Sequence, residues 1–216
     1  MKKIIFIISL ISVLFLSACH SYSPTEEAPG FLPDYTILKK VPDSPEGTQI
    51  YTYKNPNVNR SDYHAVLITP VMIYQKANRK GVTDEQIEQV KTELNAGIQQ
   101  MVSKQIGLTN TAGPGVARLE VAITGAMVEK QNPKLRNLIP VSAAIFLASK
   151  ATDLDKKQPV LIVELKFTDS VSKQLLRETV TVIKGENFRM QSSSTEEFVA
   201  LAKTWVQQAL DYSGGK

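Results

Sequence analysis

The first nineteen residues constrain this chain more than any other part of the sequence. Met1-Lys2-Lys3 is a short positive stretch, and Ile4–Leu16 is an uncharged run of 13 residues broken only by two serines. A helix needs roughly 20 apolar residues to cross the hydrocarbon core of a bilayer, so this run is too short to remain as a span. Its length and flanking charge are typical of the apolar region of a secretory signal peptide. We therefore expect residues 1–18 to be removed during export.

The cleavage site is indicated by Leu16-Ser17-Ala18-Cys19, in which a leucine and two small residues precede the sole cysteine of the chain. This tetrapeptide resembles the bacterial lipobox, which implies cleavage between Ala18 and Cys19 and acyl chains on Cys19. Two or more chains anchor a protein stably, because each buried methylene contributes about 0.8 kcal/mol. In that class an aspartate after the cysteine commonly retains the protein at the inner membrane, whereas His20 and Ser21 stand here. We expect an acylated Cys19 in the outer membrane, with the domain facing the periplasm.

The residues after Cys19 lack an apolar period. Ser21–Gly30 contains two prolines and a glycine, a composition typical of linkers. The sequence therefore predicts a lipidated flexible tether over 19–30 and a globular domain over 31–216. From Cys19 to Phe31 the chain reaches at most roughly 40 Å at full extension, so we expect the domain to work close to the lipid surface.

Composition excludes several classes of function. Basic residues exceed acidic ones by 25 to 21, and the excess falls to two once Lys2 and Lys3 are removed, so we expect no nucleic-acid partner. One cysteine excludes an internal disulfide and a multi-cysteine zinc site, and two histidines leave little for acid–base chemistry. The sequence contains none of the common nucleotide-binding, serine-hydrolase or zinc-protease motifs. We expect no catalytic residues, no metal and no cofactor.

The rest of the pattern predicts an α+β domain. Apolar runs and alternation predict strands over 48–53, 65–74, 117–124, 159–168 and 175–184. The second of these is nearly all apolar and is expected to be buried on both faces, although Pro70 inside it predicts an edge, a bulge or a break. Capping boxes at Thr83–Gln86 and Ser194–Glu197 open two amphipathic helices. We expect a mixed, mainly antiparallel sheet packed against these helices in a single domain.

Two features leave the mode of binding open. Leu138–Ala148 is apolar all round but too short to span a bilayer. It is either a buried helix or an exposed patch that contacts lipid or a partner. Tyrosines gather early in the domain and fit either a ligand groove or ordinary strand positions. The candidate binding surface from these features comprises Tyr51, Tyr53, Tyr63, Ile139 and Phe146.

Four segments are similar to a large family of bacterial lipoproteins catalogued only as a domain of unknown function. They are Gly30–Tyr35, Ile68–Val71, Gly113–Leu119 and Asp169–Ser170, and the resemblance covers most of the chain from about Gly30 to the last helix. The order of elements more distantly resembles envelope lipoproteins that assist transport, secretion or cell-wall synthesis machines. The resemblance implies an envelope location and brings no known activity with it.

Together these features predict a non-enzymatic envelope lipoprotein whose domain binds an envelope protein partner or ligand and acts as an adaptor. Two alternatives stay open. One is a membrane-tethered hydrolase that uses His64 with a serine or aspartate distant in sequence. The other is a carrier of a lipid or small apolar ligand, with Leu138–Ala148 as one wall of its cavity.

Overall fold

The computed structural model describes residues 30–79, 81–130, 157–185 and 195–213. In this part of the chain one sheet has the strand order β1-β2-β8-β7-β6-β3-β5, and β4 pairs with β6 beyond β3. The strands are β1 (Lys39–Lys40), β2 (Thr48–Lys54), β3 (Ala65–Ile68), β4 (Met72–Asn78), β5 (Gly107–Leu108), β6 (Val116–Lys130), β7 (Lys157–Asp169) and β8 (Leu175–Lys184).

The sheet is mixed. Neighbouring strands are antiparallel from β1 through β2, β8 and β7 to β6. On the other side of β6 the pairing is parallel, with β3 and β4 against β6 and β5 against β3. The predicted α+β class, with a mixed and mainly antiparallel sheet in a single domain, is confirmed.

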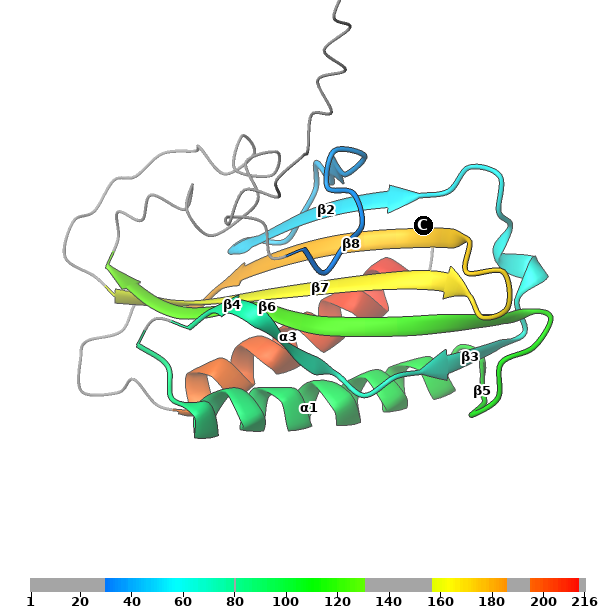
Figure 1. The fold of residues 1–216 in the computed structure, drawn as a ribbon. Helices are drawn as coiled ribbons and strands as arrows, with labels where there is room; N and C mark the ends of the chain where they lie inside the picture. The colour runs from blue at the N-terminus through cyan, green and yellow to red at the C-terminus, as the bar shows by residue number, and fades with distance from the viewer. Residues whose placement is uncertain (1–29, 80, 131–156, 186–194, 214–216) are drawn as a thin grey trace, which may run out of the picture.

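Two helices, α1 (Asp84–Ser103) and α3 (Thr195–Ser213), cover one face of the sheet (Figure 1). α1 begins after Thr83, whose side chain accepts a hydrogen bond from the Gln86 N–H while Gln86 Oε1 accepts one from the Thr83 N–H. The predicted capping box is therefore confirmed. The buried face of α1 consists of Ile87, Val90, Leu94, Ile98, Met101 and Val102.

α3 supplies the second layer of the same core. Phe198, Leu201 and Trp205 are buried against the sheet and α1. Gly97 lets the two helices approach closely, because a Cβ built there would lie 2.6 Å from Val206 Cγ2. The capping residue predicted for this helix, Ser194, lies outside the described residues.

The opposite face of the sheet is covered by residues 30–38, drawn in dark blue in Figure 1. This segment buries a set of apolar side chains, Phe31, Leu32, Tyr35 and Leu38. They pack with Tyr51 of β2 and with inward-facing residues of β6, β7 and β8 into a second core cluster. The central strands are consequently buried on both faces, each face with its own apolar layer.

The strand predicted over 65–74 is two shorter strands. β3 ends at Ile68 and β4 begins at Met72, because Pro70 between them has no N–H for the ladder. The break that Pro70 predicted is present. The expected burial on both faces is wrong, since Ile68 is half-buried and Met72 is 39% exposed. Both strands lie near the edge of the sheet, where the described residues provide no long neighbouring strand on one side.

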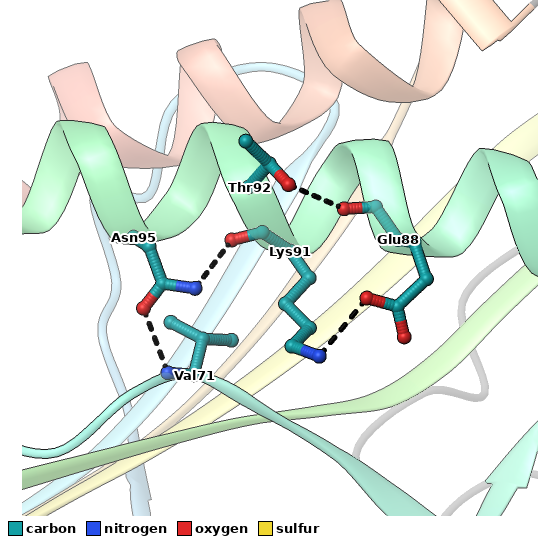
Figure 2. Close-up of polar contacts among 5 residues, drawn as sticks. All are labelled: Val71, Glu88, Lys91, Thr92 and Asn95. Carbon is teal, nitrogen blue, oxygen red and sulfur yellow. Dashed lines mark hydrogen bonds and ion pairs between the residues drawn. The ribbon is translucent and has the colours of Figure 1, made fainter.

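Helix α1 supplies the hydrogen bonds that the broken strand lacks. The N–H of Val71, a residue only 1% exposed, donates to Asn95 Oδ1 at 2.8 Å. Asn95 Nδ2 donates to the Lys91 carbonyl at 2.9 Å, which fixes the amide on the helix (Figure 2). Thr92 and Glu88 in the same view bond within α1 only. Asn95 therefore joins the helix to the strand break.

We predict that Asn95→Ala lowers the free energy of unfolding by about 1–3 kcal/mol, because the buried Val71 N–H loses its acceptor. Asn95→Asp keeps an acceptor and should cost less. Thr92→Ala is the matched control on the same helix, expected to stay within about 0.5 kcal/mol of the parent. Chemical denaturation measures all three, and equal stabilities for Asn95→Ala and Thr92→Ala would contradict the role given to Asn95.

Candidate binding site between the sheet and the helices

Strand β8 carries charged side chains on both faces at the centre of the sheet. Successive strand residues point to opposite faces. Arg177 and Thr179 face the helices, whereas Glu178 and Val180 face residues 30–38. Charged residues are rare in such interior positions, so both faces around β8 are candidate sites.

A partly open cavity of about 90 Å³ lies on the helix side of the sheet. Leu119, Leu165 and Phe167 line it from β6 and β7, and Trp205 and Ala209 line it from α3. The polar side chains of its wall are Arg177, Thr179, Thr181 and Gln208. Such a mixture of apolar walls and a few convergent polar groups is typical of small-ligand sites.

Arg177 is the charged group of this cavity. Its Nε donates to Thr52 Oγ1 at 3.4 Å. No carboxylate among the described residues forms an ion pair with it. Burial lowers the pKa of the Arg177 guanidinium, but an arginine stays charged in proteins. Arg177 is half-buried, and a partly desolvated cation without an ion-pair partner among the described residues favours an anion from outside the described chain.

Gln208 holds the other end of the polar lining. Its Nε2 donates to Thr48 Oγ1 at 3.0 Å, which ties α3 to the beginning of β2. Its Oε1 is buried and has no hydrogen-bond partner in the described part of the chain. Buried polar atoms are normally paired, so this oxygen is a second unsatisfied group in the cavity wall.

A pair of buried carboxyl groups lies on the opposite face, beneath residues 30–38. Glu164 accepts hydrogen bonds from Tyr35 Oη at 2.7 Å and Thr124 Oγ1 at 2.9 Å. Glu178 is 0% exposed, and neither of its oxygens has a hydrogen-bond partner within the described residues. The register pairs Glu178 with Lys166 and Glu164 with Val180, so the two acids are diagonal neighbours on one face.

The two carboxyl groups have unusual proton affinities. Burial raises the pKa of Glu164 to about 7. The hydrogen bonds from Tyr35 and Thr124 lower this pKa, because they favour the charged form, but their effect is smaller than that of burial. Burial also raises the pKa of Glu178 to about 7, and the negative charge of Asp34 adds to this while Lys166 opposes it. Burial, followed by the charge of Glu164, raises the pKa of the Tyr35 hydroxyl. Tyr35 is thus bound to the sheet by a hydrogen bond to Glu164, a group whose protonation state changes near pH 7.

The structure separates the tyrosines of the predicted binding surface. Tyr51 is 2% exposed in the cluster beneath residues 30–38, and Tyr53 packs against the same cluster. Tyr63 packs on the helix-side core instead, and its hydroxyl donates to Asp169 Oδ2 at 3.2 Å. Ile139 and Phe146 lie outside the described residues, as do Ala18 and Cys19. A surface shared by all five predicted residues stays a prediction.

His64, the proposed base of a hydrolase, lies on the surface. Its ring lies against Gly115, where an added Cβ would be 2.5 Å from His64 Nδ1. No described serine or carboxylate bonds to that ring, so the hydrolase hypothesis has no support in this geometry. The described residues also contain no group of three or more His, Cys, Asp or Glu side chains arranged to hold a metal ion. None of the described helices is long and apolar enough to cross a membrane.

Four residues of these sites were not predicted from the sequence: Arg177, Gln208, Glu164 and Glu178. Three of them carried a signal, because each is a charged residue within a largely apolar strand. Glu164 follows Ile162 at a spacing of two, and Glu178 precedes Val180 at the same spacing. Gln208 carried no comparable signal, since a polar residue on an amphipathic helix is ordinary.

A family model described as "Protein of unknown function (DUF3313)" matches residues 27–209. No curated protein matches the sequence significantly.

Solved structures give distant similarities. A neuraminyllactose-binding hemagglutinin homologue from Helicobacter pylori is 10% identical, with 74% of this chain and 85% of that one covered and a TM-score of 0.39. The PelC dodecamer from Paraburkholderia phytofirmans is 11% identical, covering 73% and 96% with a TM-score of 0.35. A minor lipoprotein from Acinetobacter baumannii is 14% identical, covering 70% and 93% with a TM-score of 0.29. Similarities at this level carry no conclusion about function.

Proposed function

The chain belongs to the DUF3313 family of proteins of unknown function, and within that family we propose that it is a lipid-anchored envelope protein whose domain binds rather than catalyses. The observation that carries this proposal is the uncharged run Ile4–Leu16, which ends in Leu16-Ser17-Ala18-Cys19 at the sole cysteine of the chain. Cys19 carries the acyl chains, and the domain faces the periplasm from the outer membrane. The domain acts as an adaptor for an envelope partner.

The described part of the chain suits such a tethered domain. Residues 30–38 join the sheet on the face opposite α1 and α3 (Figure 1). The tether therefore reaches the domain on one side while the helix side, with its cavity, faces away from this attachment. A partner or ligand can then be bound without competing with the tether for the same surface.

The anchor is tested with Cys19→Ser in cells fed a palmitate analogue. We expect complete loss of label and accumulation of a precursor that retains residues 1–18, because the acyl acceptor is absent. Ser21→Ala, two residues further on, is the matched control and should be labelled like the parent. Label that persists in Cys19→Ser would falsify the assignment.

Partner binding is tested by crosslinking in intact cells followed by mass spectrometry. Comparison of the parent with Cys19→Ser separates partners that meet the anchored protein from background. A specific neighbour enriched with the parent supports an adaptor, and equal recovery from both strains argues against it.

A second function, carriage of a small ligand, is favoured by one observation of its own. The cavity on the helix side contains a cation, Arg177, that forms no ion pair with the described residues and lies among apolar walls. The wall expected from Leu138–Ala148 lies outside the described residues, and the cavity is lined by β6, β7, β8 and the helices.

A further inference from the structure

The cavity combines two features that a structural void would lack. Arg177 is half-buried in its wall, and within the described residues its one hydrogen bond runs from Nε to a threonine hydroxyl. Gln208 Oε1, in the same wall, has no partner in the described part of the chain. Empty cavities in proteins are generally apolar, whereas this one holds a positive charge and an unsatisfied acceptor.

We propose that this cavity binds a small monocarboxylate with a short apolar chain, whose carboxylate accepts hydrogen bonds from the guanidinium of Arg177. The apolar chain lies between Leu119, Phe167 and Trp205. This inference deepens the ligand-carrying role proposed above and rests on it.

The charge of the ligand follows from the lining. Arg177 is the sole basic side chain among the cavity residues, so it matches one negative charge rather than the two of a phosphate ester. The planar fork of a guanidinium fits a carboxylate with two parallel hydrogen bonds. Glu178 cannot satisfy Arg177 from within, because adjacent strand residues point to opposite faces of the sheet.

The size of the ligand follows from the volume. A cavity of 150 Å³ holds benzene, and this one measures about 90 Å³. In proportion, the cavity encloses about three or four carbons, so the apolar chain lies inside with the carboxylate at the open side, and a long fatty acid exceeds the space. The aromatic and aliphatic walls of Phe167, Trp205 and Leu119 suit such a chain better than a polar one.

Trp205 provides the readout, because it is the sole tryptophan of the chain and lines the cavity. The full chain, purified in mild detergent, is titrated with valerate and with valeramide, which has nearly the same shape without the charge. We expect a saturable change in tryptophan fluorescence with valerate and at least about tenfold weaker binding of valeramide.

Two substitutions and one control assign the site. Arg177→Met should weaken valerate binding at least about tenfold while keeping the fold, because it removes the charge but keeps most of the side chain's apolar length. Ala209→Leu should abolish binding by filling the cavity. Arg118→Met is the matched control, since Arg118 is also a strand arginine with a buried, unpartnered Nε but lies outside the cavity lining.

Thermal unfolding of each variant confirms that it is folded. Absence of a saturable change with valerate in the parent, or equal affinity of Arg177→Met and Arg118→Met for valerate, would overturn the proposal. The fluorescence titration is independent of Cys19, so failure here and failure of the palmitate-labelling test are separate results.

Discussion

Raising the pH from about 5 to about 8 will lower the free energy of unfolding, by on the order of 3 kcal/mol for each of Glu164 and Glu178. Both carboxyl groups have pKa values of about 7 in the folded protein against an ordinary 4.5. Both side chains are almost fully buried, at 1% and 0% exposure, so solvent screens this effect little.

The sign follows from the protons that each state holds. Between about pH 4.5 and 7 the folded protein keeps these two protons while the unfolded chain has lost them. Stability therefore falls as pH rises through this window. The contribution is fully present below pH 4.5 and is lost above about pH 7, where the folded state must hold two charged carboxylates without solvent.

Neutral substitutions identify the groups. Glu178→Gln should raise stability at pH 8 and flatten the profile, because it removes the charge while keeping the shape. Glu164→Gln should do the same with a smaller gain, since the charged form of Glu164 already accepts two hydrogen bonds. Glu88→Gln is the control, as that side chain is 57% exposed on α1. Urea denaturation at pH 5, 6, 7 and 8 gives the comparison, and a flat parent profile would refute the prediction.

Tyr35→Ala will destabilise the protein by about 3–5 kcal/mol, the usual cost of emptying a large buried aromatic site. Tyr35 is 6% exposed and packs with Phe31, Leu32 and Leu38 over the sheet. The substitution also removes the hydroxyl that donates to Glu164 at 2.7 Å. We expect residues 30–38 to lose their main attachment to the sheet.

Tyr35→Phe separates the two contributions. It keeps the ring and removes the hydroxyl, so it should cost about 1–3 kcal/mol. The Tyr35 hydrogen bond lowers the pKa of Glu164, and its loss should make the pH profile of stability steeper. Denaturation and limited proteolysis measure the two variants. Equal losses for Phe and Ala would show that the ring adds nothing to the attachment.

The helix-side core could be predicted from the sequence. The apolar residues at helical spacing after Thr83 are the buried residues of α1, because a 3.6-residue period and a capping box agree with each other there. Strands β2, β7 and β8 were likewise found within two residues of their observed ends, since their apolar runs are bounded by turn residues.

Other parts of the fold depend on distant contacts that one sequence does not reveal. The apolar residues of Gly30–Leu38 follow neither the period of a strand nor that of a helix. The segment nevertheless covers one face of β2, β6, β7 and β8, through the packing of individual side chains. β5 was missed and β4 was predicted only up to Tyr74, as a continuation of β3, because both depend on pairing with distant strands. The parallel pairing of β3 with β6 is also a product of topology, set by α1 between them.

The site was less predictable than the fold. Arg177 and Glu178 were visible as charges in an apolar strand, but the sequence does not tell whether such a charge meets a partner. The cavity arises where β8, β7 and α3 come together, and its lining residues Arg177 and Trp205 are 28 residues apart in the chain. Trp205 and Arg177 share it only because the last helix returns over the sheet.

The break at Pro70 affects whether two copies of this protein can pair through the edges of their sheets. An unbroken strand at the border of a sheet offers a row of free backbone groups to a strand of another molecule, which is the first step of aggregation. Here that border is divided into β5, β3 and β4, with two, four and seven residues. The other border ends in the two exposed lysines of β1. Many copies can therefore be present at high local concentration without pairing through their edge strands.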